Sequence, residues 1–286
     1  MKYYLTTVFL LFGFLSVACK NNGSCPDGKS ASANYSKNVS AVTGGGWYKP
    51  AKTVTWQWQL SGTVNTAYAV EIYDIDLFDT TSGEIAALQG AGKKVICYFS
   101  AGSYENWRSD KSDFDKTDLG NPLDGWDGEK WLDIRSKNVF NIMKARLDLA
   151  VQKGCDGVEP DNVDVHTQDS CFNISASEMI AYNRNLANAA HNRNLAVALK
   201  NDPDQMSSLV DYYDFSISEQ CNEYSECASY QPMLDANKPV LNAEYRSLYK
   251  TNGAARTSMC NDSNAQGIRT LILDIDLDDS YRFSCF

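Results

Sequence analysis

The stretch that decides the fold is Gly154-Cys155-Asp156-Gly157-Val158-Glu159-Pro160-Asp161-Asn162-Val163-Asp164, a predicted short strand with four acidic residues. A second stretch, Phe215-Ser216-Ile217-Ser218-Glu219-Gln220-Cys221, repeats the design, because apolar residues alternate along it before a carboxylate and an amide. In parallel α/β folds, the carboxyl ends of the strands line one edge of the sheet. Each stretch therefore predicts acidic side chains that a different strand delivers to such an edge.

Strand-like and helix-like segments alternate along residues 46–286. The expected strands are residues 54–60, 69–74, 94–100, 156–159, 195–200, 213–218, 239–243 and 268–274, and the expected helices are 83–91, 139–153, 175–192, 204–210, 225–237 and 253–258. Residues 103–137 are expected to form a long functional loop. Eight strands in one domain of ~240 residues favour a single (β/α)8 barrel, a TIM barrel of the α/β class. A doubly wound sheet is the alternative, but no Gly-rich phosphate loop follows any predicted strand.

The N-terminus carries a targeting pattern. Residues 1–19 combine Lys2, an apolar run and small residues at a cleavage site, which predicts a signal peptide. Cys19 directly after Ala18 also resembles a bacterial lipoprotein signal, so lipid anchoring and ordinary cleavage both stay open. Residues 20–45 are rich in Asn, Ser, Gly and Ala and predict a flexible tether. We therefore expect a secreted or extracytoplasmic protein that reaches a membrane only through Cys19.

The formal net charge of −10 argues against nucleic acid as a partner, because phosphate binding needs patches of Lys and Arg. An acidic surface favours a cationic ligand or serves solubility alone. The chain is expected to act as a monomer. No metal or cofactor is expected, because the sequence has two histidines and no Cys-x-x-Cys pair.

Nine cysteines include Cys19, and the other eight form an even number that suits an oxidising compartment. The better disulfide candidates are Cys171, Cys221, Cys227 and Cys260, whose pairing stays open. Cys97 and Cys155 lie in apolar strand patterns and are expected to be buried thiols. A bond between Cys25 and Cys285 is a weaker expectation, since barrel folds often bring the termini together.

Asp161 and Glu219 are the candidate catalytic residues. Cleavage of a glycosidic bond needs one carboxylate at the anomeric carbon and a second carboxyl that protonates the leaving oxygen. The alternative is that both are solvated loop acids. Candidate substrate-binding residues lie at or near the predicted strand ends: Trp58, Asp74, Tyr98, Ser100, Asn162, Asp164, Lys200, Asn201, Gln220, Glu244 and Asp274.

At this point the chain resembles glycoside hydrolase family 114, the endo-α-1,4-polygalactosaminidases. The resembling segments are residues 56–60, 95–103, 155–164, 198–201 and 217–221, in the family's order. The resemblance implies a (β/α)8 barrel that cleaves α-1,4-linked galactosamine-rich polysaccharide, a polymer of fungal and bacterial biofilm matrix. It also implies that Asp161 and Glu219 are the catalytic acids. By analogy with other barrel glycosidases, Asp161 would be the nucleophile and Glu219 the general acid/base. Glu159 stands where the family commonly has Asp.

The sequence therefore predicts a secreted, endo-acting and retaining glycoside hydrolase. Retention requires carboxyl groups ~5–5.5 Å apart, whereas inversion requires ~6.5–9.5 Å. One alternative is a lectin-like barrel that binds amino-sugar polymer without cutting it. The others are a glycosidase of different sugar specificity and a deacetylase, although a deacetylase usually needs a metal with His and Asp ligands.

Overall fold

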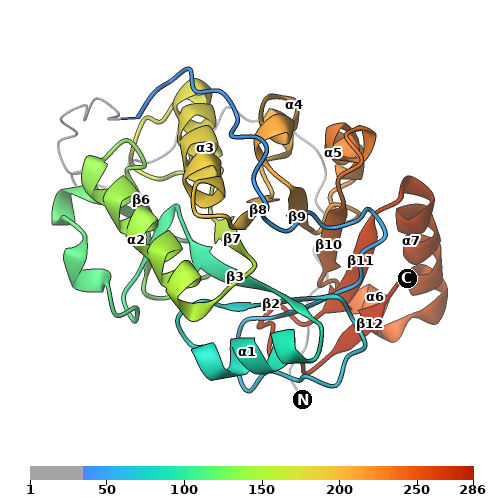
Figure 1. The fold of residues 1–286 in the computed structure, drawn as a ribbon. Helices are drawn as coiled ribbons and strands as arrows, with labels where there is room; N and C mark the ends of the chain where they lie inside the picture. The colour runs from blue at the N-terminus through green and yellow to red at the C-terminus, as the bar shows by residue number, and fades with distance from the viewer. Residues whose placement is uncertain (1–34) are drawn as a thin grey trace, which may run out of the picture.

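The computed structural model describes residues 35–286, and its main feature is one curled sheet of nine strands (Figure 1). In spatial order the strands are β1 Trp56–Gln59, β2 Ile72–Asp76, β3 Lys94–Ser100, β7 Gly157–Asp161, β8 Ala196–Lys200, β9 Phe215–Glu219, β10 Val240–Glu244, β11 Arg269–Leu273 and β12 Arg282–Ser284. The first eight pair in parallel, and β12 pairs antiparallel with β11. The predicted signal peptide with Cys19, and the tether before residue 35, lie outside the described residues.

Helices connect most of the parallel strands. They are α1 Ser82–Gly90, α2 Lys137–Lys153, α3 Ala176–His191, α4 Met206–Leu209, α5 Gln231–Asp235, α6 Ser247–Thr251 and α7 Gly253–Gln266. Local sequence explains their ends, since Ser175 and Glu178 form the capping box of α3 and Gly154 ends α2 with a φ of 91°. The helix expected at 225–237 is shorter, because Pro232 favours the first turn of a helix and α5 begins just before it. Within residues 35–286, no helix is long and apolar enough to cross a membrane.

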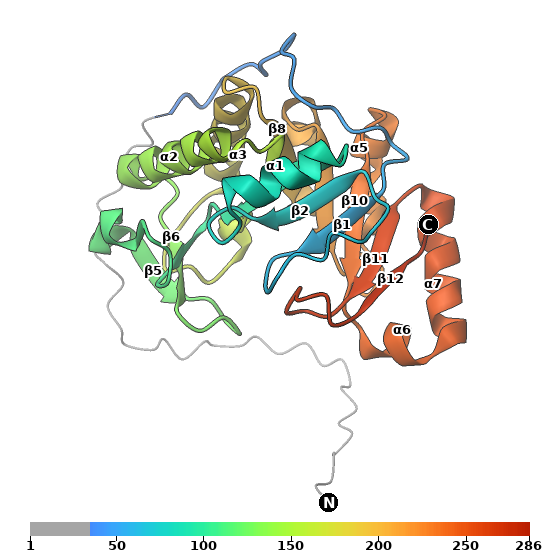
Figure 2. The same ribbon diagram turned by 60° about the horizontal axis from the view of Figure 1, so that its bottom comes forward.

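The sheet curls far enough to bring its first strand beside its last parallel strand. The Trp56 indole N–H of β1 donates to the Arg269 carbonyl of β11 over 2.9 Å, and the Leu60 amide donates to the Leu277 carbonyl over 2.9 Å. Figure 2 shows the curled sheet with α2, α3 and α7 around its outside. Eight parallel strands enclosed by helices confirm the predicted (β/α)8 barrel.

The core has two layers, one inside the barrel and one outside the strands. Inside, Trp56 and Trp58 of β1 pack with the small residues Ala196 and Ala198 of β8. Outside, apolar side chains of the strands pack against the buried faces of α1, α2 and α3. Burial on both faces explains why these strands are nearly continuous apolar runs in the sequence.

The expected long loop between β3 and α2 contains a small sheet. Its strands are β4 Ser103–Glu105, β5 Leu119–Pro122 and β6 Glu129–Leu132, which pair antiparallel in the order β4-β6-β5. Buried ion pairs attach it to the barrel, because Arg108 lies 2.6 Å from Asp76 of β2. Within the insertion, Arg108 also lies 2.8 Å from Glu105. Arg146 of α2 lies 2.8 Å from Asp110. This insertion is therefore a fixed wall beside the carboxyl ends of the strands.

Residues 35–45, the last part of the predicted tether, contact the barrel. The Tyr35 hydroxyl donates to the Ile134 carbonyl over 2.9 Å, and Asn188 of α3 bonds the backbone of both Ser40 and Val42. Tyr35 is buried and joins the outer core layer. The contacts of the barrel domain thus begin about ten residues before the expected boundary at residue 46.

The disulfides correct two expectations. Cys97 and Cys155, expected to be buried thiols, form a disulfide, because β3 and β7 are neighbours and bring their Cα atoms within 6.1 Å. Cys285 bonds to Cys260 of α7 and so not to Cys25, which lies outside the described residues. The candidates Cys221 and Cys227 bond to each other, and Cys171 is also disulfide-bonded.

Candidate active site

A cleft of about 410 Å³ opens at the carboxyl ends of the strands. Its lining side chains come from β1, β2, β3, β7, β8 and β9, from the segment after β11, and from the insertion that holds β4–β6. In barrels of this fold, the carboxyl ends of the strands form the mouth in which active sites are built. The cleft therefore lies where the sequence predicts the site.

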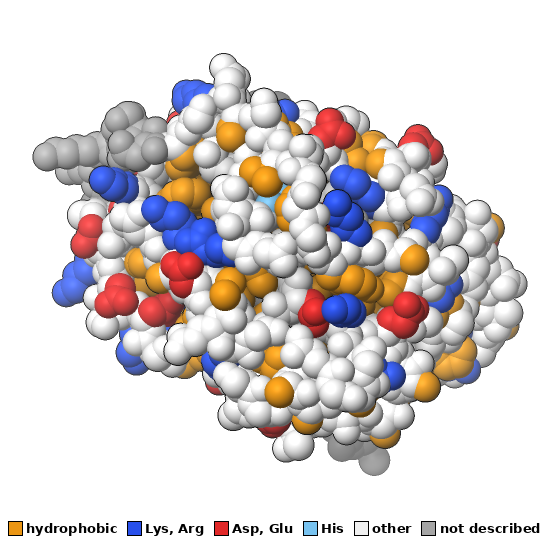
Figure 3. Space-filling model, viewed as in Figure 1, with side chains coloured by type: hydrophobic (Ala, Val, Ile, Leu, Met, Phe, Trp, Pro, Cys, Tyr) orange, Lys and Arg blue, Asp and Glu red, His pale blue; other side chains and the backbone are white. Residues whose placement is uncertain are grey.

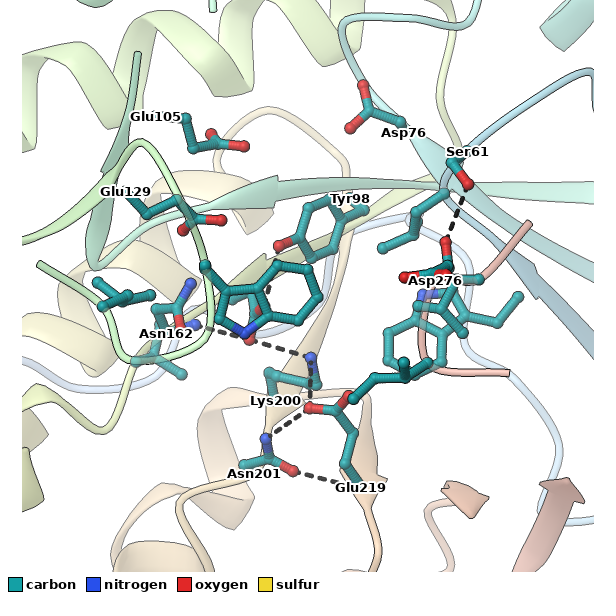
Figure 4. A pocket seen from close by; sticks show the side chains of 18 of the residues that line it. Ser61, Asp76, Tyr98, Glu105, Glu129, Asn162, Lys200, Asn201, Glu219 and Asp276 are labelled. Carbon is teal, nitrogen blue, oxygen red and sulfur yellow. Dashed lines mark hydrogen bonds and ion pairs between the residues drawn. The ribbon is translucent and has the colours of Figure 1, made fainter. Parts of the chain in front are cut away.

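Asp161 ends β7, Glu219 ends β9, and Lys200 ends the strand between them. The Lys200 ammonium lies 3.0 Å from Asp161 Oδ1 and 3.2 Å from Glu219 Oε2. Figure 4 shows Lys200 pointing toward Glu219 within the pocket. Because one nitrogen touches both oxygens, those two oxygens lie at most about 6.2 Å apart, the sum of the two distances. The structure thus brings the two predicted catalytic carboxyls together.

Neutral donors complete the surroundings of each carboxylate. The Tyr98 hydroxyl donates to Asp161 Oδ2 over 2.9 Å, and the Tyr245 hydroxyl donates to Glu219 Oε1. Burial, and then the nearby carboxylates, raise the pKa of both tyrosines well above the usual range, so both hydroxyls keep their protons. Asn201 donates to Glu219 Oε2 over 3.1 Å and accepts from the Glu219 amide over 2.9 Å. These contacts fix the orientation of both acids.

Left-handed backbone follows each of the three strands that carry these groups. The φ angles are 59° at Asn162, 48° at Asn201 and 58° at Gln220. Positive φ is uncommon for residues other than glycine, although Asn adopts it more readily. The chain therefore turns away directly after Asp161, Lys200 and Glu219, which leaves these side chains at the strand ends.

A pair of acids with no exposed surface lies under Lys200. Asp74 of β2 and Glu159 of β7 are fully buried, and neither carboxyl has a hydrogen-bond partner in residues 35–286 beyond the contact between them. The Lys200 ammonium lies 3.5 Å from Glu159. Burial raises the pKa of Asp74 to about 8 and that of Glu159 well above its usual range, the latter helped by Asp74. The pair therefore holds at least one proton at neutral pH.

Lys200 itself stays charged. Burial lowers its pKa, but the carboxylates of Asp161, Glu219 and Glu159 outweigh that effect and raise it well above the usual range. A permanent cation therefore stands at the floor of the cleft, in contact with three carboxyl groups.

The cleft is acidic, whereas the outer surface in Figure 3 mixes Lys and Arg with Asp and Glu. Two basic residues line the cleft, Arg108 and Lys200. The acidic residues that line it are eight: Asp76, Asp79, Glu105, Glu129, Asp161, Asp164, Glu219 and Asp276. Figure 4 shows Glu105 and Glu129 on one side of the pocket and Asp276 on the other. A concave acidic surface of this kind concentrates cations. In the part of the chain that the structure describes, no three His, Cys, Asp or Glu side chains are arranged to hold a metal ion.

Glu129 extends the site along the insertion. It accepts a hydrogen bond from the Ser103 hydroxyl over 2.6 Å, and Ser103 contacts Ser100 and Asn162. Burial raises the pKa of Glu129 to about 7. Trp107 and Trp126 of the same insertion line the cleft and are exposed, so their rings are available to a ligand.

Six of the predicted substrate-binding residues line the cleft with the catalytic pair: Trp58, Tyr98, Asn162, Asp164, Lys200 and Asn201. The other five do not. Asp74, Ser100 and Glu244 are fully buried, and Glu244 bonds to Asn222 and Asn242. Gln220 lines a neighbouring hollow, and Asp274 pairs with Lys250.

Sequence reasoning missed Tyr245, Glu129 and Glu105. Tyr245 directly follows Glu244 at the end of β10, so the same strand-end rule that selects Glu244 could have found it. Glu105 and Glu129 belong to the insertion, where no strand pattern indicated which side chains would point into the cleft.

Comparison with known proteins gives one family. The model described as glycoside-hydrolase family GH114 matches residues 36–285. The crystal structure of Aspergillus fumigatus Ega3 in complex with galactosamine is similar, with a TM-score of 0.80, 42% identity, and coverage of 88% of this chain and 100% of that chain. The glycoside hydrolase domain of PelA from Pseudomonas aeruginosa shares the fold, with a TM-score of 0.61, 10% identity, and coverage of 80% and 97%. No curated protein matches the chain.

Proposed function

Because the chain belongs to glycoside-hydrolase family GH114, we propose that it is an endo-acting hydrolase of α-1,4-linked, galactosamine-rich polysaccharide. Its membership of the family makes it a glycoside hydrolase, and the substrate is the proposed part. Ega3, 42% identical to this chain, has a structure in complex with galactosamine. The acidic cleft supports this substrate, because galactosamine with a free amine is a cation.

In the proposed reaction, Asp161 is the nucleophile and Glu219 is the general acid/base. In the reactive form Glu219 must be protonated, and it gives this proton to the leaving glycosidic oxygen while Asp161 attacks the anomeric carbon. Glu219, now a carboxylate, then takes a proton from the water that attacks the anomeric carbon and releases Asp161. The side chain of Asp161 is 17% exposed and that of Glu219 is 29% exposed, so the proposed acid/base is the one that water reaches more easily.

One observation carries the proposal of retention: a single ammonium group contacts both carboxylates. The limit of about 6.2 Å between the two contacted oxygens lies below the ~6.5–9.5 Å that inverting enzymes need for a water molecule between their carboxyls. It is compatible with the ~5–5.5 Å of retaining enzymes. Lys200 and Tyr98 both donate to Asp161, and two such donors stabilise the negative charge that a nucleophile needs.

The disulfides support a place of action outside the cytoplasm, because such bonds persist in oxidising compartments. We propose that the protein is secreted, either with a lipid attached at Cys19 or with an unmodified N-terminus after ordinary signal cleavage. Mass spectrometry of the mature N-terminus separates these two cases, since an acylated Cys19 and an unmodified N-terminus differ by the mass of the lipid.

The test of the proposed function is product analysis on a partially deacetylated α-1,4-galactosamine polymer. The wild-type protein should release short oligosaccharides, and Asp161→Asn and Glu219→Gln should each lose about 10²- to 10⁴-fold in rate. Nuclear magnetic resonance of the first products should show retained anomeric configuration. Unchanged turnover by either variant would refute the assignment of the pair, and initial products of inverted configuration would refute retention.

The lectin-like alternative gives a different result in the same experiment. A binding protein would retain the polymer on a column or sensor surface and would release no oligosaccharides from it. Wild-type protein that neither cuts nor binds this polymer would reject the galactosamine substrate, while its family membership would still direct the search to other polysaccharides.

A further inference from the structure

A second hollow of about 400 Å³ lies beside the main cleft, and Glu219 borders both. Asp164 and Asn201 also line both hollows, whereas Asp161 and Lys200 line the main cleft alone. Glu219 therefore stands between the two spaces, with the proposed nucleophile on one side only.

This position has a chemical consequence, which rests on the function proposed above. A general acid protonates the oxygen that joins two sugars, so it must reach between them. The sugar that Asp161 attacks must lie over Asp161, in the main cleft. The leaving sugar must then lie on the side of Glu219 that faces away from Asp161. The second hollow borders Glu219 and not Asp161, so it is the space for this sugar.

The second hollow is acidic throughout. Asp202, Asp204 and Glu226 line it in addition to Asp164 and Glu219, and none of its described lining residues is Lys or Arg. Asp204 is exposed and Glu226 partly exposed, so both can meet a ligand. A sugar with a free amine is attracted by carboxylates that it can reach in this way, whereas an N-acetylated sugar is neutral and gains nothing from them.

Asp202 supplies a second, independent sign of a ligand. Its side chain lines the hollow and is only 2% exposed, yet Oδ1 has no hydrogen-bond partner among residues 35–286. Its other oxygen accepts from Asn183 over 3.1 Å. Buried polar atoms are normally paired, so an unpaired one beside a hollow indicates that a hydroxyl or an amine completes it.

The rim of the hollow is already in place. Tyr224 is 64% exposed and stands on the loop that the disulfide between Cys221 and Cys227 closes. Inside this loop, the Glu226 amide donates to the Cys221 carbonyl over 2.9 Å. A pre-ordered loop binds with a smaller entropic cost, and an exposed tyrosine ring can stack on a sugar face.

We infer that the second hollow is the subsite for the leaving sugar, and that Asp204 and Glu226 select a sugar with a free amine there. The protein then prefers to cut bonds in which the leaving sugar is a galactosamine with a free amine, rather than cutting at random along a partially N-acetylated chain. Each newly formed non-reducing end carries the selected sugar, because the leaving sugar becomes that end after cleavage.

The experiment uses the full chain and a polymer of mixed free and N-acetylated amines. Products are sequenced by mass spectrometry, and the fraction of new non-reducing ends with a free amine is compared with the fraction in the polymer. Wild type should enrich free amines, and the double variant Asp204→Asn/Glu226→Gln should reduce this enrichment about 2- to 10-fold. Asp262→Asn removes an exposed charge on α7, far along the chain from the hollow, and should keep the wild-type enrichment.

The readout is a ratio among products, so any measured cleavage also shows that a variant is folded. The single variants replace the double variant if the double one does not fold. Wild-type ends that match the polymer composition, or variant ends that keep the wild-type enrichment, overturn the inference. Absence of cleavage by wild type is a different result, because it rejects the proposed function itself.

Discussion

Lys200 shows how one residue sets the electrostatics of the site. Its ammonium lies within 3.5 Å of Glu159, Asp161 and Glu219, and the residue is only 2% exposed. A buried charged group is stable only if an opposite charge compensates it or a proton transfer neutralises it. Lys200 supplies the counter-charge, and the proton held between Asp74 and Glu159 reduces what it must compensate.

Replacing Lys200 with methionine should therefore disturb both stability and activity. Removing one partner from a buried ion pair costs about 3–5 kcal/mol, because the remaining charge is left uncompensated. We expect Lys200→Met to lower the free energy of unfolding by about that amount, measured by urea denaturation. Turnover of the polymer should also fall, because Asp161 loses a donor to its carboxylate.

A double variant provides the control for this prediction. Glu159→Gln removes one of the buried carboxyls next to Lys200, so Lys200→Met/Glu159→Gln should recover part of the lost stability. Activity should stay low, since Asp161 still lacks the ammonium. Additive losses of stability in the double variant would show that the two residues do not interact as the structure places them.

At the level of elements, the strand ends were easier to predict than the segments between them. The buried strands are apolar runs, and a carboxylate or amide marks the end of most of them, which is why Asp161 and Glu219 could be selected from the sequence. The insertion could not be predicted in the same way. Its strand Leu119–Pro122 is four residues long and contains Gly120 and Pro122, so it has no alternation to detect.

Some residues predicted to bind substrate are buried, and the sequence does not show this depth directly. Asp74 and Glu244 end or nearly end strands and were expected to bind substrate, but both are fully buried. Sequence shows that a carboxyl lies near a strand end, whereas its depth depends on the tilt of the strand in the barrel.

The chain just after β3 and the chain just after β7 come so close at Gly102 that a larger residue there should disturb the site. The Cβ that alanine would add at Gly102 lies 1.7 Å from the Asn162 carbonyl oxygen, next to Asp161. Gly102→Ala must push the end of β7 away, so Asp161 should move and turnover should fall at least ~10²-fold. Gly90→Ala in α1 is the matched control, because its Cβ meets no atom within 4 Å. Equal activity of the two variants would contradict this role for Gly102.

Several acids buried in different parts of the molecule have raised pKa values, and these make the free energy of unfolding depend on pH. Burial raises the pKa of Asp74 and Asp202 to about 8 and that of Glu129 to about 7. These groups titrate near pH 4 when the chain is unfolded. Between about pH 4 and pH 8, these three groups bind more protons in the folded state than in the unfolded state, so their contribution to stability falls as the pH rises.

Asp202 allows this dependence to be tested on a single group. Asn cannot titrate but can keep the hydrogen bond from Asn183, so Asp202→Asn should remain folded. Between pH 4 and pH 8, its free energy of unfolding should fall less steeply than that of wild type, by up to about 1.4 kcal/mol per pH unit. Urea denaturation at several pH values measures both slopes, and Asp262→Asn controls for the loss of one exposed carboxyl. Identical slopes for Asp202→Asn and wild type would mean that Asp202 is already ionised in the folded protein, and that the second hollow carries one more negative charge at neutral pH.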